Sequence, residues 1–206
     1  MKILVIAGNP KSKGALATLT GEVARGASEA GADVETLRLK DMDIRYCKFC
    51  MSCYKDTESE IAPCVLKDDM EGVREKIKEA DGYILSCPIS SGHANAIMKT
   101  FIERSTYTIG RSTGRMLFIK GIPESRLTDR RRCAVTITTA GAMPAWLRIA
   151  CNGSTREMVE LADRIFNAEV LAKMYIGRLT FRGLKETEKQ KAYSVGRELA
   201  RYSPQD

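Results

Sequence analysis

Apolar and polar residues follow two patterns along this chain, and together the patterns predict strands that alternate with helices. Unbroken apolar runs, such as residues 2–8 and 83–88, are typical of strands that are covered on both faces of a parallel sheet. Between these runs the apolar residues recur at three- and four-residue steps, as they do in residues 15–31, which predicts amphipathic helices. A chain with this pattern is expected to fold as an α/β domain.

The predicted elements are spread over the whole chain. We expect strands at residues 2–8, 33–39, 83–88, 133–141 and 168–177. We expect helices at residues 15–31, 67–82, 94–105, 154–166 and 185–202. This alternation predicts one doubly wound, five-stranded parallel sheet within a single domain over residues 1–206. The strand at 33–39 alternates apolar and polar residues and is expected at an edge of the sheet, while residues 106–132 form a candidate insertion.

Length and hydropathy narrow the class of protein. The chain of 206 residues is long enough to bury a core without disulfides, and it has no run of about 18 apolar residues that could cross a membrane. The first apolar run, which follows Lys2, is too short for a signal peptide. We therefore expect a cytoplasmic protein that makes no contact with a membrane.

The net charge of +7 favours an acidic partner. No recognition motif for nucleic acid accompanies the basic residues, which are spread along the chain, so we expect no nucleic-acid partner. The one dense basic patch, Arg130–Arg132, has two interpretations. It is either a solvated loop that enters a strand or a docking patch for an acidic electron donor such as a ferredoxin.

Four of the seven cysteines are crowded into a loop at residues 46–64. Cys47, Cys50 and Cys53 lie at three-residue intervals, and Cys64 follows after a gap of ten residues. In a cytoplasmic chain this pattern indicates metal binding or redox use and not disulfides. The first three have the spacing of ferredoxin-type [4Fe–4S] ligands. Zinc, which normally takes two separated pairs of ligands, and a set of plain thiols stay open as alternatives.

The loops after the predicted strands are where a ligand is expected, because open α/β sheets bind ligands at the carboxyl ends of their strands. These loops cover residues 8–15, 88–93 and 139–146. The first has neither a dinucleotide fingerprint nor a P-loop, but a polar turn before a helix presents backbone N–H groups to a monophosphate. The side chains that could add donors and positive charge are those of Asn9, Ser12, Thr18, Lys11 and Lys13.

His93, the only histidine, lies in the second of these loops. A histidine placed there could hydrogen-bond a ligand or shuttle a proton, and a merely solvated side chain is the alternative. We find no catalytic triad or acid–base pair in the rest of the sequence.

Four stretches, taken together and in order, carry a resemblance to a known family. Residues 87–104 hold a strand end with a proline, a short loop with Gly92, and a helix that reads A-x-x-K-x-F-I-E-R. The sequences GNPKSKG at 8–14, VLKDDM at 65–70 and TTAGA at 138–142 accompany it. This combination resembles the flavodoxin-like NAD(P)H-dependent FMN reductases over most of the chain.

The resemblance implies a flavodoxin-like fold with strand order 2-1-3-4-5, FMN as cofactor and NAD(P)H as a substrate. It also implies a homodimer or homotetramer with the flavin at a subunit interface. The FMN phosphate would lie at residues 8–16, and the isoalloxazine ring would lie beside residues 88–93 and 139–142. The flavin-binding residues implied in this way are Gly8, Asn9, Lys11, Ser12, Lys13, Gly14, Ala15, Leu16, Pro88, Ile89, Ser90, Ser91, Gly92, His93, Thr139, Ala140 and Gly141.

The chain departs from the family pattern at three of these positions. Ala15 and Leu16 stand where the family usually has Asn followed by Ser or Thr, and Ser90 stands where it usually has an aromatic residue. We therefore expect either weaker flavin binding or an aromatic ring supplied by a neighbouring subunit, with Tyr107 and Trp146 as the candidates.

The cysteines resemble one branch of the family, the iron–sulfur flavoproteins. That branch carries a compact Cys-x2-Cys-x2-Cys run and a fourth cysteine before V-x-K-D-D-M, which implies that Cys47, Cys50, Cys53 and Cys64 hold a [4Fe–4S] cluster. The gap before Cys64 is longer than in that pattern. The predicted function is a redox protein that passes electrons from NAD(P)H or a reduced carrier through FMN and a [4Fe–4S] cluster to an acceptor. The alternatives are a cluster-free FMN or quinone reductase and a flavin-free redox or metal sensor.

Overall fold

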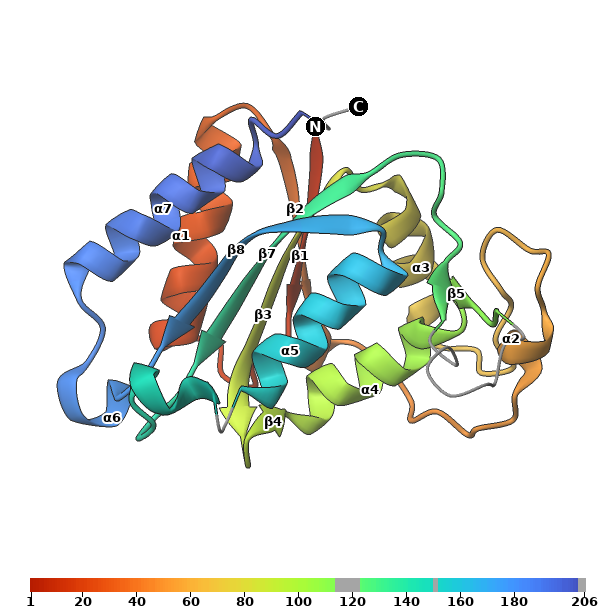
Figure 1. Cartoon of the computed structure of the whole chain (residues 1–206), viewed down its shortest axis with the longest axis horizontal. Helices are drawn as coiled ribbons and strands as arrows, with labels where there is room; N and C mark the ends of the chain where they lie inside the picture. The colour runs from red at the N-terminus through yellow and green to blue at the C-terminus, as the bar shows by residue number, and fades with distance from the viewer. Residues whose placement is uncertain (114–122, 150–151, 204–206) are drawn as a thin grey trace.

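A parallel sheet of five strands forms the centre of the computed structural model, which describes residues 1–113, 123–149 and 152–203 (Figure 1). Its strands are β1 (Lys2–Ala7), β2 (Asp33–Arg38), β3 (Gly82–Ser90), β7 (Arg132–Thr139) and β8 (Ala168–Ile176). They lie in the order β2-β1-β3-β7-β8, which is the flavodoxin-like order 2-1-3-4-5 when only these strands are counted. The predicted topology is confirmed, and so is the edge position of β2.

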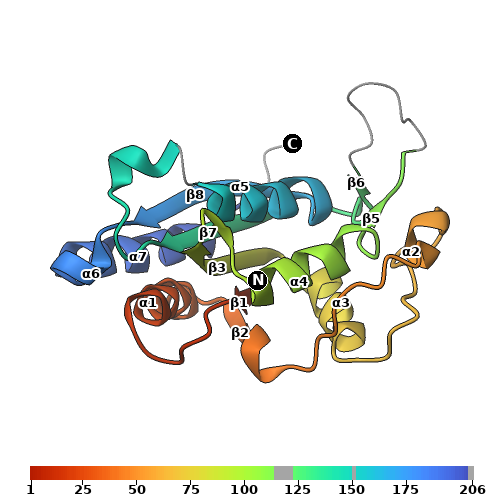
Figure 2. The same cartoon turned by 90° about the horizontal axis from the view of Figure 1, so that it is seen from below.

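Two small additions accompany this sheet. β4 (His93–Ala94) pairs antiparallel with the end of β3 and forms a hairpin with it. β5 (Gly110–Arg111) and β6 (Glu124–Ser125) make a separate two-stranded sheet beside the cysteine-rich loop (Figure 2). Both strands belong to the candidate insertion at residues 106–132, of which residues 114–122 lie outside the described part of the chain.

Helices cover both faces of the sheet. The α-helices are α1 (Ala15–Glu29), α2 (Ser52–Lys55), α3 (Met70–Glu79), α4 (Ala96–Thr106), α5 (Gly153–Glu160), α6 (Leu179–Arg182) and α7 (Glu186–Leu199). Short 3-10 turns lie at η1 (Leu39–Asp41) and η2 (Ala145–Ile149), and a π-helical turn, η3 (Leu161–Ile165), extends α5. α1 and α7 pack on one face, while α3, α4 and α5 pack on the other (Figure 1). In the described residues, no helix is long and apolar enough to cross a membrane.

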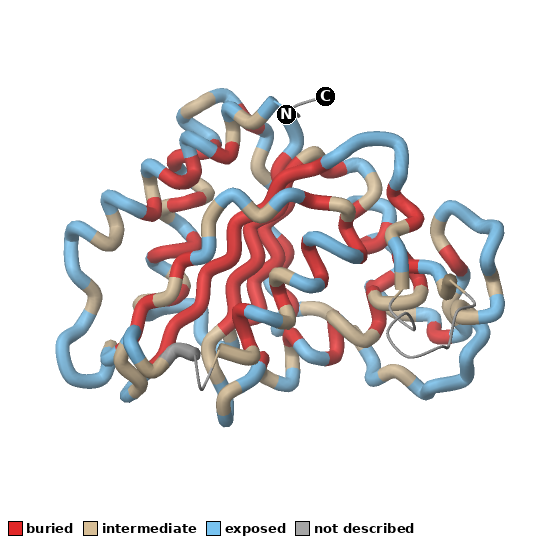
Figure 3. Tube along the Cα trace, in the orientation of Figure 1, coloured by how far each residue is buried: buried red, intermediate tan, exposed pale blue. Residues whose placement is uncertain are grey.

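The unbroken apolar run of β1 has a simple structural reason. Leu4 and Ile6 belong to the core under α3, α4 and α5, whereas Ile3 and Val5 belong to the core under α1 and α7. Successive side chains of a strand point to opposite faces, so a strand that is covered on both faces must be apolar at every position. Figure 3 shows the resulting band of buried residues along the central strands.

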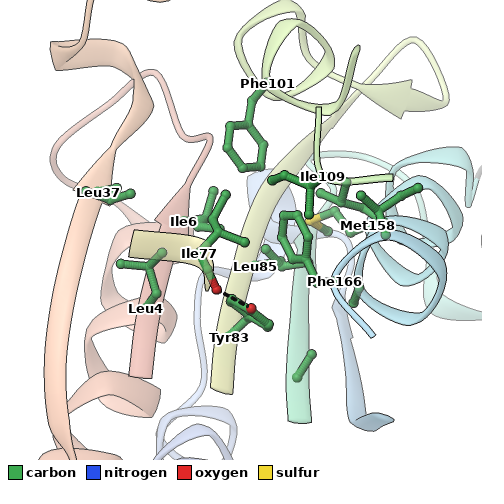
Figure 4. Packing of buried hydrophobic residues seen from close by; sticks show 14 of the residues in the cluster. Leu4, Ile6, Leu37, Ile77, Tyr83, Leu85, Phe101, Ile109, Met158 and Phe166 are labelled. Atoms are coloured by element: carbon green, nitrogen blue, oxygen red, sulfur yellow. Dashed lines mark hydrogen bonds between the residues drawn. The ribbon is translucent and has the colours of Figure 1, made fainter. Parts of the chain in front are cut away.

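Aromatic residues fill the core on the side of α4 (Figure 4). The rings of Tyr83 and Phe166 pack with their centroids 4.8 Å apart, and the rings of Phe101 and Phe166 lie 6.3 Å apart. The buried hydroxyl of Tyr83 donates a hydrogen bond of 2.7 Å to the carbonyl oxygen of Ile77, at the end of α3. A buried tyrosine needs such a partner, and this one ties α3 to β3.

The predicted solvated loop that enters a strand is confirmed for Arg130 and Arg131, which are exposed before β7, but it is wrong for Arg132. Arg132 is fully buried, and its guanidinium donates to the carbonyl oxygens of Lys78 and Ala80, where α3 ends. Carbonyl groups at the end of a helix lack intrahelical partners, and a buried arginine satisfies two of them here. The sequence shows three consecutive arginines but not these distant carbonyls, which is why the expectation failed for Arg132.

The exposed arginines of this patch are also paired. Arg130 contacts Asp81 and Asp129, and Arg131 contacts Asp163. The patch lies at the amino end of β7, opposite the loops that the sequence predicts to bind flavin. A docking role for it stays a prediction.

The helix predicted at residues 67–82 is shorter in the structure and covers Met70–Glu79. Its expected first turn is used differently: the carboxylates of Asp68 and Asp69 accept hydrogen bonds from the backbone N–H groups of Arg45 and Asp43. These contacts close the base of the cysteine-rich loop, which the helical pattern alone does not reveal.

Helices α1 and α7 cross at a pair of glycines. A Cβ atom at Gly26 would lie 2.1 Å from the carbonyl oxygen of Tyr193, and one at Gly196 would lie 2.0 Å from the carbonyl oxygen of Val23. Gly26→Ala is therefore expected to lower the free energy of unfolding by about 1–3 kcal/mol, because the two helices must separate. Chemical denaturation measures this change.

Gly21 supplies the matched control in the same helix, since a Cβ atom there meets nothing within 4 Å. Gly21→Ala is expected to stabilise the protein by about 0.5–1 kcal/mol, because alanine favours the helix over glycine. Equal effects of the two substitutions would contradict the close crossing of α1 and α7.

Candidate functional site

The loop between β1 and α1, residues 8–14, has the properties of a phosphate site, and we call it the phosphate loop. α1 begins after Gly14, whose φ of +117° favours glycine, and no side chain caps the helix among the described residues. The first N–H groups of α1 are thus available to an anion, and the exposed side chains of Lys11 and Lys13 lie in the same loop. The side chain of Asn9 does not project freely, because its amide nitrogen donates a hydrogen bond of 2.7 Å to the carbonyl oxygen of Lys11.

The two residues that depart from the family pattern behave differently at this loop. Ala15 is half-buried, while the side chain of Leu16 is buried in the core between the sheet and α1. Leu16 can therefore offer a ligand only its backbone N–H. Ser12 is exposed and, together with Asn9, lines a cavity of about 180 Å³ that extends along α1 to Arg38 on β2.

The second predicted loop is a tight β-hairpin. Ser90 pairs with His93, and the two residues between them, Ser91 and Gly92, have φ values of +49° and +85°. Two positive φ values in a two-residue connection define a type I′ turn. The turn folds the exposed end of β3 back on itself, so that Pro88 and Ile89 remain half-buried and Ser90 and His93 are exposed.

Asn95 joins the first two loops and is the residue that the sequence did not single out. Its Nδ2 donates a hydrogen bond of 2.6 Å to the carbonyl oxygen of Gly8. As the N-cap of α4, its Oδ1 accepts a hydrogen bond of 3.0 Å from the backbone N–H of Met98. One side chain therefore caps α4 and holds the phosphate loop against it. An asparagine directly before a helical pattern is a signal for the cap but not for the tether.

Gly8 explains why these loops can lie so close together. Its backbone N–H donates 2.8 Å to the carbonyl oxygen of Ser86, and a Cβ atom at this position would lie 2.9 Å from the Cβ of Met98. The β1–α1 loop therefore packs directly on the end of β3 and on α4, where only glycine leaves enough space.

His93 is held by a carboxylate at this edge of the sheet. Its Nδ1 lies 3.0 Å from Oε1 of Glu157 on α5, whose Oε2 lies 3.4 Å from Nζ of Lys99 on α4. A Cβ atom at Gly153 would lie 2.6 Å from the same imidazole nitrogen, so the ring packs directly on the start of α5. His93 is therefore oriented, although its side chain is largely exposed.

The third predicted loop is buried only at its first two residues. Thr139 and Ala140 are buried at the end of β7, and Gly141 is exposed. Trp146, in η2 shortly after this loop, has 76% of its surface exposed. Trp146 thus remains a candidate for an aromatic contact, whereas Tyr107 lies elsewhere, with its ring 5.1 Å from that of Tyr54 in the cysteine-rich loop.

The structure brings the four clustered cysteines together. Residues 43–69, which we call the cysteine lobe, project outward from the domain beyond α3 and α4 (Figures 1 and 2). Cys47, Cys50, Cys53 and Cys64 all line one pocket of about 140 Å³, together with Phe49, Tyr54 and Tyr107. The ten-residue gap before Cys64 therefore does not separate it from the other three.

The four thiols line an open pocket and do not converge on a single point. No three cysteine, histidine or acidic side chains converge closely enough for a single metal ion in the parts of the chain that the structure describes. The volume is several times the roughly 30 Å³ that one water molecule occupies in the liquid. Burial raises the pKa of the Cys53 thiol, and the proximity of Cys64, Cys47 and Cys50 raises it further. Four thiols around such a space suit a multi-atom cluster.

The backbone at the tip of the lobe is unusual. Phe49 and Met51, on either side of Cys50, have φ values of +49° and +60°. Non-glycine residues in this left-handed region are uncommon and cluster at functional sites. Alternating right- and left-handed residues also turn backbone N–H groups inward, as in many Fe–S sites. The tight winding of residues 47–53 therefore agrees with the three-residue spacing of the cysteines.

Two buried arginines connect the cysteine lobe to the rest of the domain. Arg104, in the last turn of α4, contacts Arg45, Cys64 and Asp68 at the base of the lobe. Arg126 donates to the carbonyl oxygens of Cys53, Asp56 and Ser59, on the far side of the loop. Neither role is visible in the sequence, because most of the acceptors are backbone carbonyls of distant residues.

Helix α4 connects the two candidate sites. Its first residues follow Asn95 at the phosphate loop, and its last turn carries Arg104 and Thr106 at the cysteine pocket (Figures 1 and 2). Eleven residues of α-helix span about 16 Å. The hairpin at β3–β4 and the cysteine pocket therefore lie at opposite ends of one rigid element.

The remaining described cysteines belong to the core. Cys87 and Cys133 are buried in β3 and β7. Burial raises the pKa of Cys87, and it raises that of Cys133 to about 12. Such thiols are unreactive at neutral pH. Cys151 lies outside the described residues.

Comparison with known proteins assigns this arrangement to a family. Residues 1–141, which include the phosphate loop, the cysteine lobe and the β3–β4 hairpin, match the family described as NADPH-dependent FMN reductase. The chain belongs to this family, as its sequence predicts.

Individual relatives are more distant. An iron-sulfur flavoprotein of Archaeoglobus fulgidus is 35% identical over 105 residues, which are 51% of this chain and 49% of that protein. An iron-sulfur flavoprotein of Methanocaldococcus jannaschii is 32% identical over 105 residues, which are 51% of this chain and 52% of that protein. The chain thus matches about half the length of these relatives. Among solved structures, an NAD(P)H:quinone oxidoreductase from Methanothermobacter marburgensis shares the fold, with a TM-score of 0.71, 21% identity and 99% of both chains covered.

Proposed function

We propose that this protein is a flavin-dependent oxidoreductase of the iron–sulfur flavoprotein type, with FMN at the carboxyl ends of the strands and a [4Fe–4S] cluster in the cysteine lobe. The observation that carries the proposal is the pocket in which Cys64 joins Cys47, Cys50 and Cys53. Relatives that are named iron-sulfur flavoproteins, although they match only half the chain, support it.

The residues at the strand ends support the flavin part. The uncapped start of α1, with Lys11 and Lys13 beside it, suits a phosphate monoester. Asn152 Oδ1, at the start of α5, is buried without a hydrogen-bond partner among the described residues, which leaves a polar group for a ligand at the same edge. When bound, FMN supplies hydride and single-electron chemistry, and the protein binds and orients it.

The residues of the lobe support the cluster part. Thiolates ligate iron, and the pocket places the aromatic and apolar side chains of Phe49, Tyr54 and Val65 beside the thiols. Helix α4 adds a positively charged donor, Arg104, beside the fourth cysteine. The donor set, its volume and its surroundings therefore all fit the group.

Electron donor, acceptor and assembly belong to the proposal as well. NAD(P)H or a reduced carrier would supply electrons, and the net charge of +7 favours an acidic carrier such as a ferredoxin. The acceptor would be a small molecule such as a quinone. We propose a homodimer or homotetramer in the cytoplasm, in which a neighbouring subunit covers the exposed flavin edge.

A second candidate is a cluster-free quinone reductase. The fold match to the NAD(P)H:quinone oxidoreductase from Methanothermobacter marburgensis, over 99% of both chains, favours it. A flavin-free redox or metal sensor would be the third, if the departures at Ala15, Leu16 and Ser90 prevented FMN binding. The three candidates differ in which groups the purified chain holds.

One anaerobic reconstitution separates them. The full chain, treated with FMN, ferrous iron and sulfide and then desalted, is expected to retain FMN together with about four irons and four sulfides. Retention of FMN without iron would establish the cluster-free reductase instead. Failure to retain FMN would contradict the flavin enzyme and leave a sensor.

A further inference from the structure

The side chain of Arg104 occupies an unusual position between the folded sheet and the cysteine lobe. Its side chain is only 1% exposed, and that of its partner Asp68 is fully buried. The two form a bidentate pair, with Nη1 2.5 Å from Oδ2 and Nη2 3.0 Å from Oδ1. Two parallel bonds fix the plane of the guanidinium and leave one further N–H on each of its terminal nitrogens.

Those two remaining N–H groups both reach the cysteine lobe. Nη1 donates 2.7 Å to the carbonyl oxygen of Arg45, two residues before Cys47. Nη2 lies 3.6 Å from Sγ of Cys64 and donates to it. A single arginine thus contacts both arms of the lobe, at the point where the chain enters it and at the point where it leaves.

Of the four proposed ligands, Cys64 is the one whose position depends on Arg104. The other three cysteines belong to one tightly wound run, whereas Cys64 comes from a separate segment. That segment is fixed to the domain by a backbone hydrogen bond of 2.8 Å from Ala62 to Thr108 and by the contact of Arg104 with the sulfur. Arg104 therefore places the fourth thiol beside the other three.

We infer that Arg104 is a positioning residue for the proposed cluster, which it serves by holding Cys64 Sγ in the pocket and by raising the reduction potential of the cluster. The inference rests on the proposed function. A donor to a ligand sulfur stabilises the reduced cluster more than the oxidised one, because reduction adds negative charge to the iron–sulfur unit. A lysine cannot replace this donor, since one ammonium cannot span Asp68 and the sulfur as the planar fork does.

Arg126 provides the matched control. It is equally buried, with 2% of its side chain exposed, and it donates to the carbonyl oxygens of Gly110 and Ser59 at 2.9 and 2.6 Å. Its hydrogen bonds to the lobe all end on backbone oxygens, and none of those described ends on a sulfur. Arg126 thus anchors the lobe without a donor to a ligand.

The experiment is a redox titration of the reconstituted full chain, followed by electron paramagnetic resonance of the reduced cluster. Arg104→Lys is expected to lower the midpoint potential by at least about 59 mV, which corresponds to a tenfold change in the one-electron reduction equilibrium. Arg126→Lys is expected to leave the potential within a twofold change. Iron and FMN contents, measured on the same samples, report the occupancy of both sites.

Asp68→Asn gives a second and opposite test. It keeps the donor to Cys64 but removes the counter-charge of Arg104, so the potential is expected to rise. This variant also tests the role of Arg104 if Arg104→Lys does not fold.

The outcomes separate this inference from the proposed function. A wild-type chain without iron would overturn both, and iron content alone reveals it. If the wild-type chain holds the cluster, two results would overturn only the role of Arg104. The first is an unchanged midpoint potential in Arg104→Lys, and the second is an equal lowering of the potential in Arg126→Lys. A potential that does not rise in Asp68→Asn would do the same.

Discussion

Replacing Cys50 with alanine is expected to remove nearly all iron from the reconstituted chain and to leave its FMN content unchanged. Cys50 lies at the centre of the wound run, between the left-handed residues Phe49 and Met51. The pocket holds four cysteines, so three thiolates would remain for a cluster that needs four ligands. FMN should stay because its proposed site lies at the other end of α4, about 16 Å away by helix length.

Iron, acid-labile sulfide and flavin per chain are the measurements for this variant. Cys133→Ala is the control, since Cys133 is also a thiol but is buried in β7, away from the lobe. It is expected to keep both groups. Wild-type iron in Cys50→Ala would show that the ligand assignment is wrong, and loss of FMN together with iron would show that the two sites depend on each other.

Replacing Asn95 with serine is expected to weaken FMN binding about tenfold, which corresponds to the loss of roughly one hydrogen bond. Serine still caps α4, but it cannot reach the carbonyl oxygen of Gly8 as the amide does at 2.6 Å. The phosphate loop would then lose its tether to α4. Quenching of FMN fluorescence by the flavin-free chain gives the dissociation constant.

Asn95→Asp is the companion variant. It also retains the cap, but it puts a carboxylate against the Gly8 carbonyl and close to the proposed phosphate, so a loss of about a hundredfold is expected. The stability of Asn95→Ser should fall by only about 1 kcal/mol, the net contribution of one hydrogen bond, because Ser and Asn are similar N-caps. Wild-type affinity in Asn95→Ser would mean that the tether does not hold the loop.

The sheet could be predicted from the sequence because its signal is local. β1 and β3 are covered on both faces, so each shows an unbroken apolar run, and the helices show their buried stripe. Residues 88–93 were predicted only as a loop with Gly92, and the β3–β4 hairpin with its left-handed Ser91 was not predicted. Cys47, Cys50 and Cys53 were also found by local spacing alone.

The residues that sequence reasoning missed share a different property. Asn95, Arg126 and Arg132 each bind backbone carbonyl oxygens of residues far away along the chain. A backbone carbonyl is present at every position and leaves no mark in the sequence, so these partners become known only once the chain is folded. The meeting of Cys64 with the other three thiols depends on such contacts, which is why its ten-residue gap could not be judged beforehand.

The exposure of the lobe tip has a consequence for the order of assembly. None of residues 46–60 is buried, whereas Ala62 and Leu66, on the returning arm, are buried in the domain. A segment with so little buried surface opens at a free energy far below that of global unfolding. We therefore expect the domain to fold before it receives iron, with Arg104 and Arg126 already in place as the surface on which the loop closes. Oxidative loss of the metal would then melt the tip alone and leave a folded flavin domain that can be loaded again.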